Sequence, residues 1–190
     1  MTVCLPVLSL KRIFLGLFFG LLLSPGLLRA QGGGCECTNC PQFMPDLFVG
    51  PFFINVQNAS NPILGQNGQG VCAVIVHFDH TAICDISITL TSPSGQVVTL
   101  VGPIGQFCTS NGNAGTTWDV TFLPCGDPVN PDPGFTPTWN NNQAWGANNA
   151  YFGSYYPFAG CLQNFTGPVN GTWTLTVTDG QANDVGNLID

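Results

Sequence analysis

The side chains that could do chemistry after residue 30 are two histidines, ten carboxylates and eight cysteines. The histidines, His77 and His80, are three residues apart, whereas the two zinc ligands on a metalloprotease helix are four apart. The chain has no Gly-x-Ser-x-Gly turn of the kind that presents a hydrolase nucleophile. These residues therefore predict no catalytic centre.

The basic residues are confined to the start of the chain. Lys11, Arg12 and Arg29 are the three cationic residues of the sequence, which has a net charge of −7. Without residues 1–30 the charge approaches −10, because ten carboxylates then face no Lys or Arg. Such a surface repels nucleic acid and anionic lipid. We expect no nucleic-acid partner, and no Lys or Arg salt bridges within the domain.

Residues 1–30 have the three parts of a secretory signal peptide. Lys11 and Arg12 precede the apolar run Ile13 to Leu23, and small residues around Ala30 offer a cleavage site. The run is shorter than the roughly 18 apolar residues that cross a bilayer. We expect a secreted or cell-surface protein with no membrane span in its mature form. An uncleaved anchor is the alternative, since residues 3–10 are also apolar.

An even number of cysteines in an exported chain predicts disulfides. Eight remain once Cys4 leaves with the signal, and the sequence leaves 105 pairings open. The Cys37-x-x-Cys40 pair lacks the second ligand pair of a zinc site, so we expect a disulfide knot in a Gly/Cys-rich leader, residues 31–46. The eight are Cys35, Cys37, Cys40, Cys72, Cys84, Cys108, Cys125 and Cys161.

From residue 47 to 190 the pattern is that of β-strands. Residues 71–78 are apolar on both faces, and residues 86–90, 118–123 and 172–178 alternate with period two. No helical period occurs after residue 30. The sequence predicts one all-β domain, an antiparallel sandwich. Residues 124–160, rich in Pro, Asn and Gly, are expected to form a long loop.

Three segments, in order, resemble the P domain (P/Homo B). They are FDHTAICDISITLTSPSGQVVTL at 78–100, TTWDVTF at 116–122 and NGTWTLTVTDGQANDVGNL at 170–188. The resemblance implies a jelly-roll-like, galactose-binding-like β-sandwich, with His80 as a structural hydrogen-bonding residue. The family's pattern usually has Gly where Cys84 stands, and it continues with one more strand after the position of Asp190. We therefore expect the 47–190 domain to be truncated before its last strand.

P domains are best known as modules that follow, fold and stabilise the catalytic domain of subtilisin/kexin-type serine proteases. Similar modules occur without a protease in large exported bacterial surface proteins. The resemblance therefore predicts a non-catalytic module with a structural, adhesion or interaction role. Its partners are then other domains of the same exported protein or a surface partner. The alternatives are an accessory domain of a serine endopeptidase and a carbohydrate-binding sandwich.

Two ligand hypotheses follow from side-chain chemistry. Asp85, Asp119, Asp179 and Asp184 lie in the family-like segments and offer the hard oxygen ligands that Ca²⁺ prefers. The other interpretation is that they accept backbone N–H bonds or form Asx turns. Aromatic rings of the 124–160 segment could stack on a glycan, or could instead cover an open end of the sandwich. These rings are Trp139, Trp145, Tyr151, Tyr155 and Tyr156.

Overall fold

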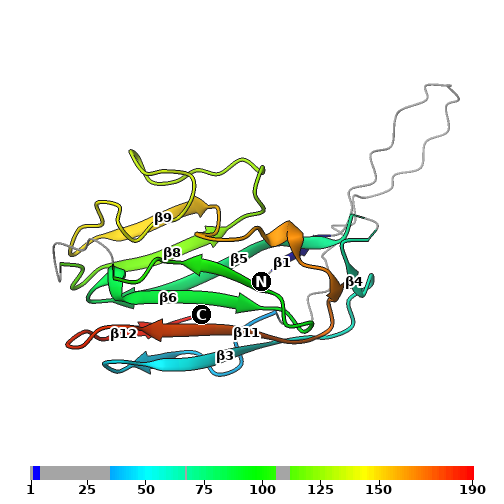
Figure 1. The fold of residues 1–190 in the computed structure, drawn as a ribbon, viewed down its shortest axis with the longest axis horizontal. Helices are drawn as coiled ribbons and strands as arrows, with labels where there is room; N and C mark the ends of the chain where they lie inside the picture. Colours follow the sequence, from blue (N-terminus) through cyan, green and yellow to red (C-terminus); the bar gives the residue numbers. More distant parts are fainter. Residues whose placement is uncertain (1, 5–34, 67, 106–111) are drawn as a thin grey trace, which may run out of the picture.

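The computed structural model describes residues 2–4, 35–66, 68–105 and 112–190. These ranges are all-β, with two short 3-10 turns, η1 (Ile83–Asp85) and η2 (Leu162–Asn164), and no α-helix (Figure 1). The strands are β1 (Thr2–Cys4), β2 (Gln42–Met44), β3 (Val49–Val56), β4 (Ile63–Leu64), β5 (Gly70–His80), β6 (Ile86–Thr91), β7 (Val97–Val101), β8 (Thr117–Phe122), β9 (Ala150–Tyr155), β10 (Gly167–Pro168), β11 (Gly171–Asp179) and β12 (Gly186–Leu188).

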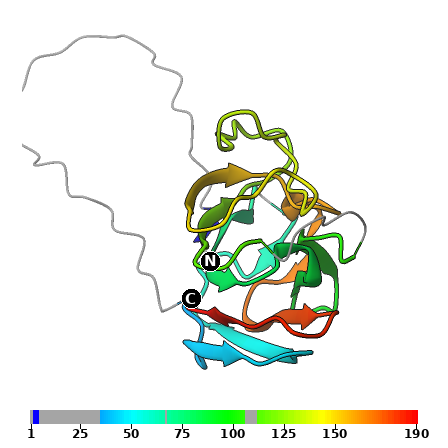
Figure 2. The ribbon, with the colours of Figure 1, turned by 90° about the vertical axis from the view of Figure 1, so that its left-hand side faces the viewer.

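Two sheets pack face to face. The larger has the order β2-β12-β5-β8-β9, with β1 also paired to β5, and the smaller has the order β3-β11-β6-β7. Figure 2 shows the two layers from the side. A small ribbon of β4 and β10 lies beside them. The predicted all-β sandwich is confirmed.

Period-two alternation places one face of each central strand in the core between the sheets. Trp173, Leu175 and Val177 of β11 are buried, and threonines occupy the positions between them. Phe78 of β5 stacks on Trp118 of β8 with ring centroids 5.1 Å apart. Because a strand's side chains alternate between its two faces, these apolar positions fix which face of each strand points inward.

One part of the predicted loop, residues 124–160, is a strand. β9 runs parallel to β8, with Thr117 opposite Ala150 and Phe122 opposite Tyr155. The loop prediction is wrong here because Gly153 and Ser154 interrupt any apolar alternation in this strand. The remainder of the segment is held to the sandwich by the Cys125–Cys161 disulfide, whose Cα atoms are 5.5 Å apart.

The N-terminal export prediction falls largely outside the described residues. β1 pairs antiparallel with β5 over Gly70 to Ala73, and residues 5–34 are not among those described. Within the described ranges, no helix has the length and apolarity needed to cross a membrane.

Candidate functional site

Three carboxylates and a histidine meet at one end of the sandwich. His80 ends β5, Asp85 ends η1, Asp179 ends β11, and Asp184 lies in the turn before β12. All four side chains are buried, with exposed fractions between 2% and 6%. Because the chain has no Lys or Arg after residue 30, no such cation balances these carboxylates. We call these four residues the acidic cluster.

The His80 ring is hydrogen-bonded through one nitrogen, and its other nitrogen faces Asp179. Its Nδ1 lies 2.8 Å from the carbonyl oxygen of Ala82, and its Nε2 lies 3.7 Å from Oδ2 of Asp179 without a hydrogen-bond partner. A Cβ on Gly186 would collide with the His80 ring, so β12 can approach this closely only with glycine. The histidine therefore has a structural setting, as the sequence predicted.

The other carboxylates bind neighbouring loops. Asp179 accepts hydrogen bonds from the backbone N–H of Leu47, at 3.1 Å, and of Gln181, at 3.3 Å. Asp184 accepts one from the hydroxyl of Thr81, at 3.0 Å. The Leu47 bond stabilises a backbone with φ of 59°, which non-glycine residues seldom adopt. The acidic cluster thus holds the turns at this end of the sandwich in place.

The pKa of Asp85 is raised to about 6, and burial is the largest cause. The hydrogen bond that Asp85 shares with Asp184, and the negative charges of Asp184 and Asp179, contribute the rest of this rise. Two carboxylates in a hydrogen-bonded pair are most stable when they share one proton. At neutral pH the acidic cluster therefore carries unfavourable like-charge repulsion.

Asp119 does not belong to the acidic cluster. It lies exposed on β8, opposite His77 of β5, on the outer face of the larger sheet. The prediction of a joint site for Asp85, Asp119, Asp179 and Asp184 is therefore wrong in this member, because Asp119 alternates outward on its strand. Within the described ranges, no group of three or more His, Cys, Asp or Glu side chains is arranged to hold a metal ion.

The chain was also compared with known proteins. Residues 69–190 match the family model of the proprotein convertase P-domain. The chain belongs to the proprotein convertase P-domain family. No curated protein and no solved structure matches it. P-domains are a family of non-catalytic accessory domains.

Most of the predicted glycan-contact rings in residues 124–160 of this P-domain are buried in its core. Trp139 and Tyr155 are fully buried and Trp145 is 6% exposed, with Trp139 and Trp145 stacked at 4.8 Å between ring centroids. These three rings have no face open to a sugar, so the glycan-contact prediction is wrong for them. The reason is that they close the end of the sandwich over Phe122 and Phe135. Tyr151 and Tyr156 are half-buried.

Sequence reasoning missed Asn141, which anchors this loop. Its amide nitrogen donates to the carbonyl oxygens of Ile83 and Ile86, each at 2.8 Å, and its Oδ1 accepts the indole N–H of Trp139 at 2.7 Å. The side chain is 1% exposed. It stands among three consecutive asparagines, and nothing in that run distinguishes the buried one.

Two disulfide pairings are established among the described residues. Cys37–Cys40 and Cys125–Cys161 are bonded, and Cys72 and Cys84 are each in a disulfide as well. The first bond confirms the predicted N-terminal knot. Cys108 lies outside the described residues.

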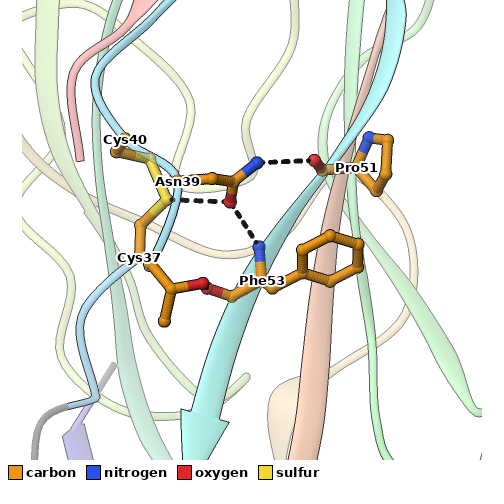
Figure 3. The surroundings of a disulfide bond; sticks show 6 residues. Cys37, Asn39, Cys40, Pro51 and Phe53 are labelled. Carbon is orange, nitrogen blue, oxygen red and sulfur yellow. Dashed lines mark hydrogen bonds between the residues drawn. A yellow bond between two sulfur atoms is a disulfide. The ribbon is translucent and has the colours of Figure 1, made fainter.

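Residues 37–40 form a tight loop against strand β3. Figure 3 shows Asn39 pointing from this loop to the main chain of Pro51 and Phe53. The sequence suggested the disulfide but gave no sign of this contact, because the loop and β3 are brought together only by the fold.

Proposed function

We propose that this chain is a non-catalytic P-domain module of a secreted or cell-surface protein, with a structural or interaction role. The observation that carries the proposal is the setting of the two histidines. His80 is buried within the acidic cluster and is shielded from solvent. His77 is half-buried on the outer sheet face, opposite Asp119.

Nucleophilic catalysis needs a base within hydrogen-bond reach of a nucleophile. In the described ranges, neither histidine ring is hydrogen-bonded to a Ser, Thr or Cys side chain; the ring of His80 contacts the Ala82 backbone instead. A surface that supports another domain needs no such arrangement. We therefore assign this domain to support or attachment.

A hydrolysis assay tests the proposal. The purified chain, incubated with casein and with fluorogenic peptides, is expected to release no product above the buffer blank. Turnover that disappears in a His77→Ala variant would overturn the proposal. Turnover that persists in His77→Ala and in His80→Ala would be traced to a contaminating protease by its separation from the chain on gel filtration.

The family match also favours a second role, as an accessory domain of a subtilisin/kexin-type serine endopeptidase. Adding the purified chain to a refolding catalytic domain of that type distinguishes the two roles. A rise in recovered protease activity favours the accessory role. Unchanged recovery favours the role in support or attachment.

Export is part of the proposal. The basic flank, short apolar run and Ala30 junction support cleavage before Gln31. N-terminal sequencing of the protein recovered outside the producing cell is expected to begin at or near Gln31. Recovery of the intact N-terminus in the membrane fraction would favour the uncleaved anchor instead.

A further inference from the structure

Strand β3 is an edge strand with unusual composition. One side pairs with β11 along its whole length, from Val49 opposite Thr178 to Val56 opposite Gly171. None of its eight residues, VGPFFINV, is charged. Val49 is 67% exposed and Phe53 is 39% exposed. An uncharged, apolar edge strand invites pairing with a strand of another molecule, and natural proteins protect such edges.

The free edge of β3 is covered by residues 37–40. The Thr38 N–H donates to the carbonyl oxygen of Phe53 at 2.8 Å, and the Thr38 hydroxyl donates to the same oxygen at 3.1 Å. The Phe53 N–H donates to Oδ1 of Asn39 at 2.9 Å, and Nδ2 of Asn39 donates to the carbonyl oxygen of Pro51 at 3.1 Å (Figure 3).

The side chain of Asn39 thus makes the hydrogen bonds to β3 that the backbone of a neighbouring strand would make. Its carboxamide carries N–H donors beside a carbonyl acceptor, as a strand's backbone does, and it bonds one acceptor and one donor of β3. Pro51 contributes to the same end, since it has no N–H to offer an incoming strand. Together, Thr38, Asn39 and Pro51 leave the middle of the β3 edge without a free hydrogen-bonding group.

The disulfide keeps this cover in place. Thr38 and Asn39 are exposed, so their hydrogen bonds compete with water and are weak by themselves. The Cys37–Cys40 bond closes a loop around them, and Cys37 also forms a β-bridge with Ile54. Closing the loop reduces the number of conformations in which Thr38 and Asn39 point away from β3.

We propose that residues 37–40 are a redox-sensitive edge guard, whose opening lets β3 pair antiparallel with β3 of a second copy of this chain. An external dithiol reduces the bond: its two thiols become a disulfide, and Cys37 and Cys40 become thiols. The hydrogen bonds from Thr38 and Asn39 to β3 are then replaced by bonds to water, and the edge of β3 is exposed.

A second copy is the occupant because the edge is complementary to itself. β3 has no charge to repel its own copy, and antiparallel pairing centred on Ile54 sets Phe53 opposite Asn55 of the second copy, clear of Pro51. The acidic charge of the whole chain opposes association at long range, and salt screens it. The dimer should therefore strengthen as ionic strength rises.

Two variants of the full-length chain test the guard. Cys37→Ser/Cys40→Ser removes the disulfide, and Asn39→Ala removes the amide while keeping the disulfide. Under dilute, low-salt conditions where the chain is monomeric, we expect hydrogen exchange at the Phe53 amide to quicken at least tenfold in both, because that N–H then loses its Asn39 acceptor. In the double variant we also expect a concentration-dependent dimer by light scattering. Cys125→Ser/Cys161→Ser is the matched control, and its Phe53 exchange should equal that of the wild type.

Three results would overturn the proposal. Unchanged Phe53 exchange in both test variants would show that residues 37–40 do not guard β3. Faster exchange with a monomer at all concentrations and at high salt would exclude the second copy as occupant. An equal effect in the Cys125/Cys161 control would mean general destabilisation rather than local opening. Should the cysteine double variant fail to fold, Asn39→Ala decides the exchange result by itself.

Discussion

The buried ionisable residues of the acidic cluster stabilise the turns at one end of this P-domain. Asp179 and Asp184 bind backbone and hydroxyl groups of adjacent turns, and His80 is packed between Ala82 and Asp179. Buried carboxylates without a cation cost stability when ionised. The acidic cluster therefore links the stability of this end of the sandwich to the solution conditions.

Acid should stabilise the fold through Asp85. Its folded-state pKa of about 6 is above the ordinary value of 3.8, so the folded chain binds this proton more tightly than the unfolded chain. The stabilisation is full below pH 3.8 and is lost as pH rises through 6. Allowing for solvent screening, the effect is about 1 kcal/mol, or roughly 2–4 °C in melting temperature.

Asp85→Asn is the test of that linkage, since an amide can donate to Asp184 as the protonated acid does. Melting temperatures measured from pH 4 to pH 8 should fall less steeply in Asp85→Asn than in wild type, and the variant should be the more stable at pH 8. Asp119→Asn, on the exposed face, controls for the change in net charge. Parallel curves for Asp85→Asn and wild type would contradict the assignment.

The calcium hypothesis raised by the sequence can be tested at the acidic cluster, where a bound cation would relieve the same repulsion at neutral pH. The described residues hold no ready-made metal site, so calcium must compete with the hydrogen bond between Asp85 and Asp184. Millimolar calcium should raise the melting temperature at pH 7.5, where Asp85 is ionised, and not at pH 5. Asp184→Asn should lose the effect and Asp119→Asn should keep it. No shift at pH 7.5 in wild type would rule calcium out.

At the scale of elements, the strands with period-two alternation were predictable and the loops were not. β6, β8 and β11 follow from alternating apolar positions that must face one core, and β5 follows from a run that is apolar on both faces. β9 was missed because Gly153 breaks its pattern and because its parallel partner β8 is distant in sequence. Trp139 and Trp145 looked like ligand contacts, since a sequence does not show which aromatic rings the fold will bury.

The stability of the 124–160 segment should depend on the side-chain amide of Asn141. Asn141→Ala leaves the carbonyls of Ile83 and Ile86 and the indole N–H of Trp139 without their partner, at about 2–4 kcal/mol of the free energy of unfolding. Urea unfolding followed by tryptophan fluorescence measures the loss. Asn142→Ala, an exposed neighbour, should unfold like wild type. Equal stability of Asn141→Ala and wild type would show that the loop is held in another way.

At the scale of the molecule, the lack of basic residues explains why disulfides matter to stability. The domain after residue 30 has no Lys or Arg, so ion pairs with those residues contribute nothing to it. Its stability rests on the apolar layer between two sheets, on backbone pairing and on disulfides, including Cys125–Cys161, which spans 36 residues. A crosslink of that span contributes about 2–4 kcal/mol.

Covalent labelling tests whether the folded chain carries an activated serine nucleophile. The purified full chain is incubated with a fluorophosphonate, which reacts with activated serine nucleophiles, and its intact mass is measured beside that of an active serine protease. We predict that the mass of the chain stays unchanged while the protease is labelled. A stoichiometric adduct on one serine, lost on unfolding the chain before labelling, would contradict it.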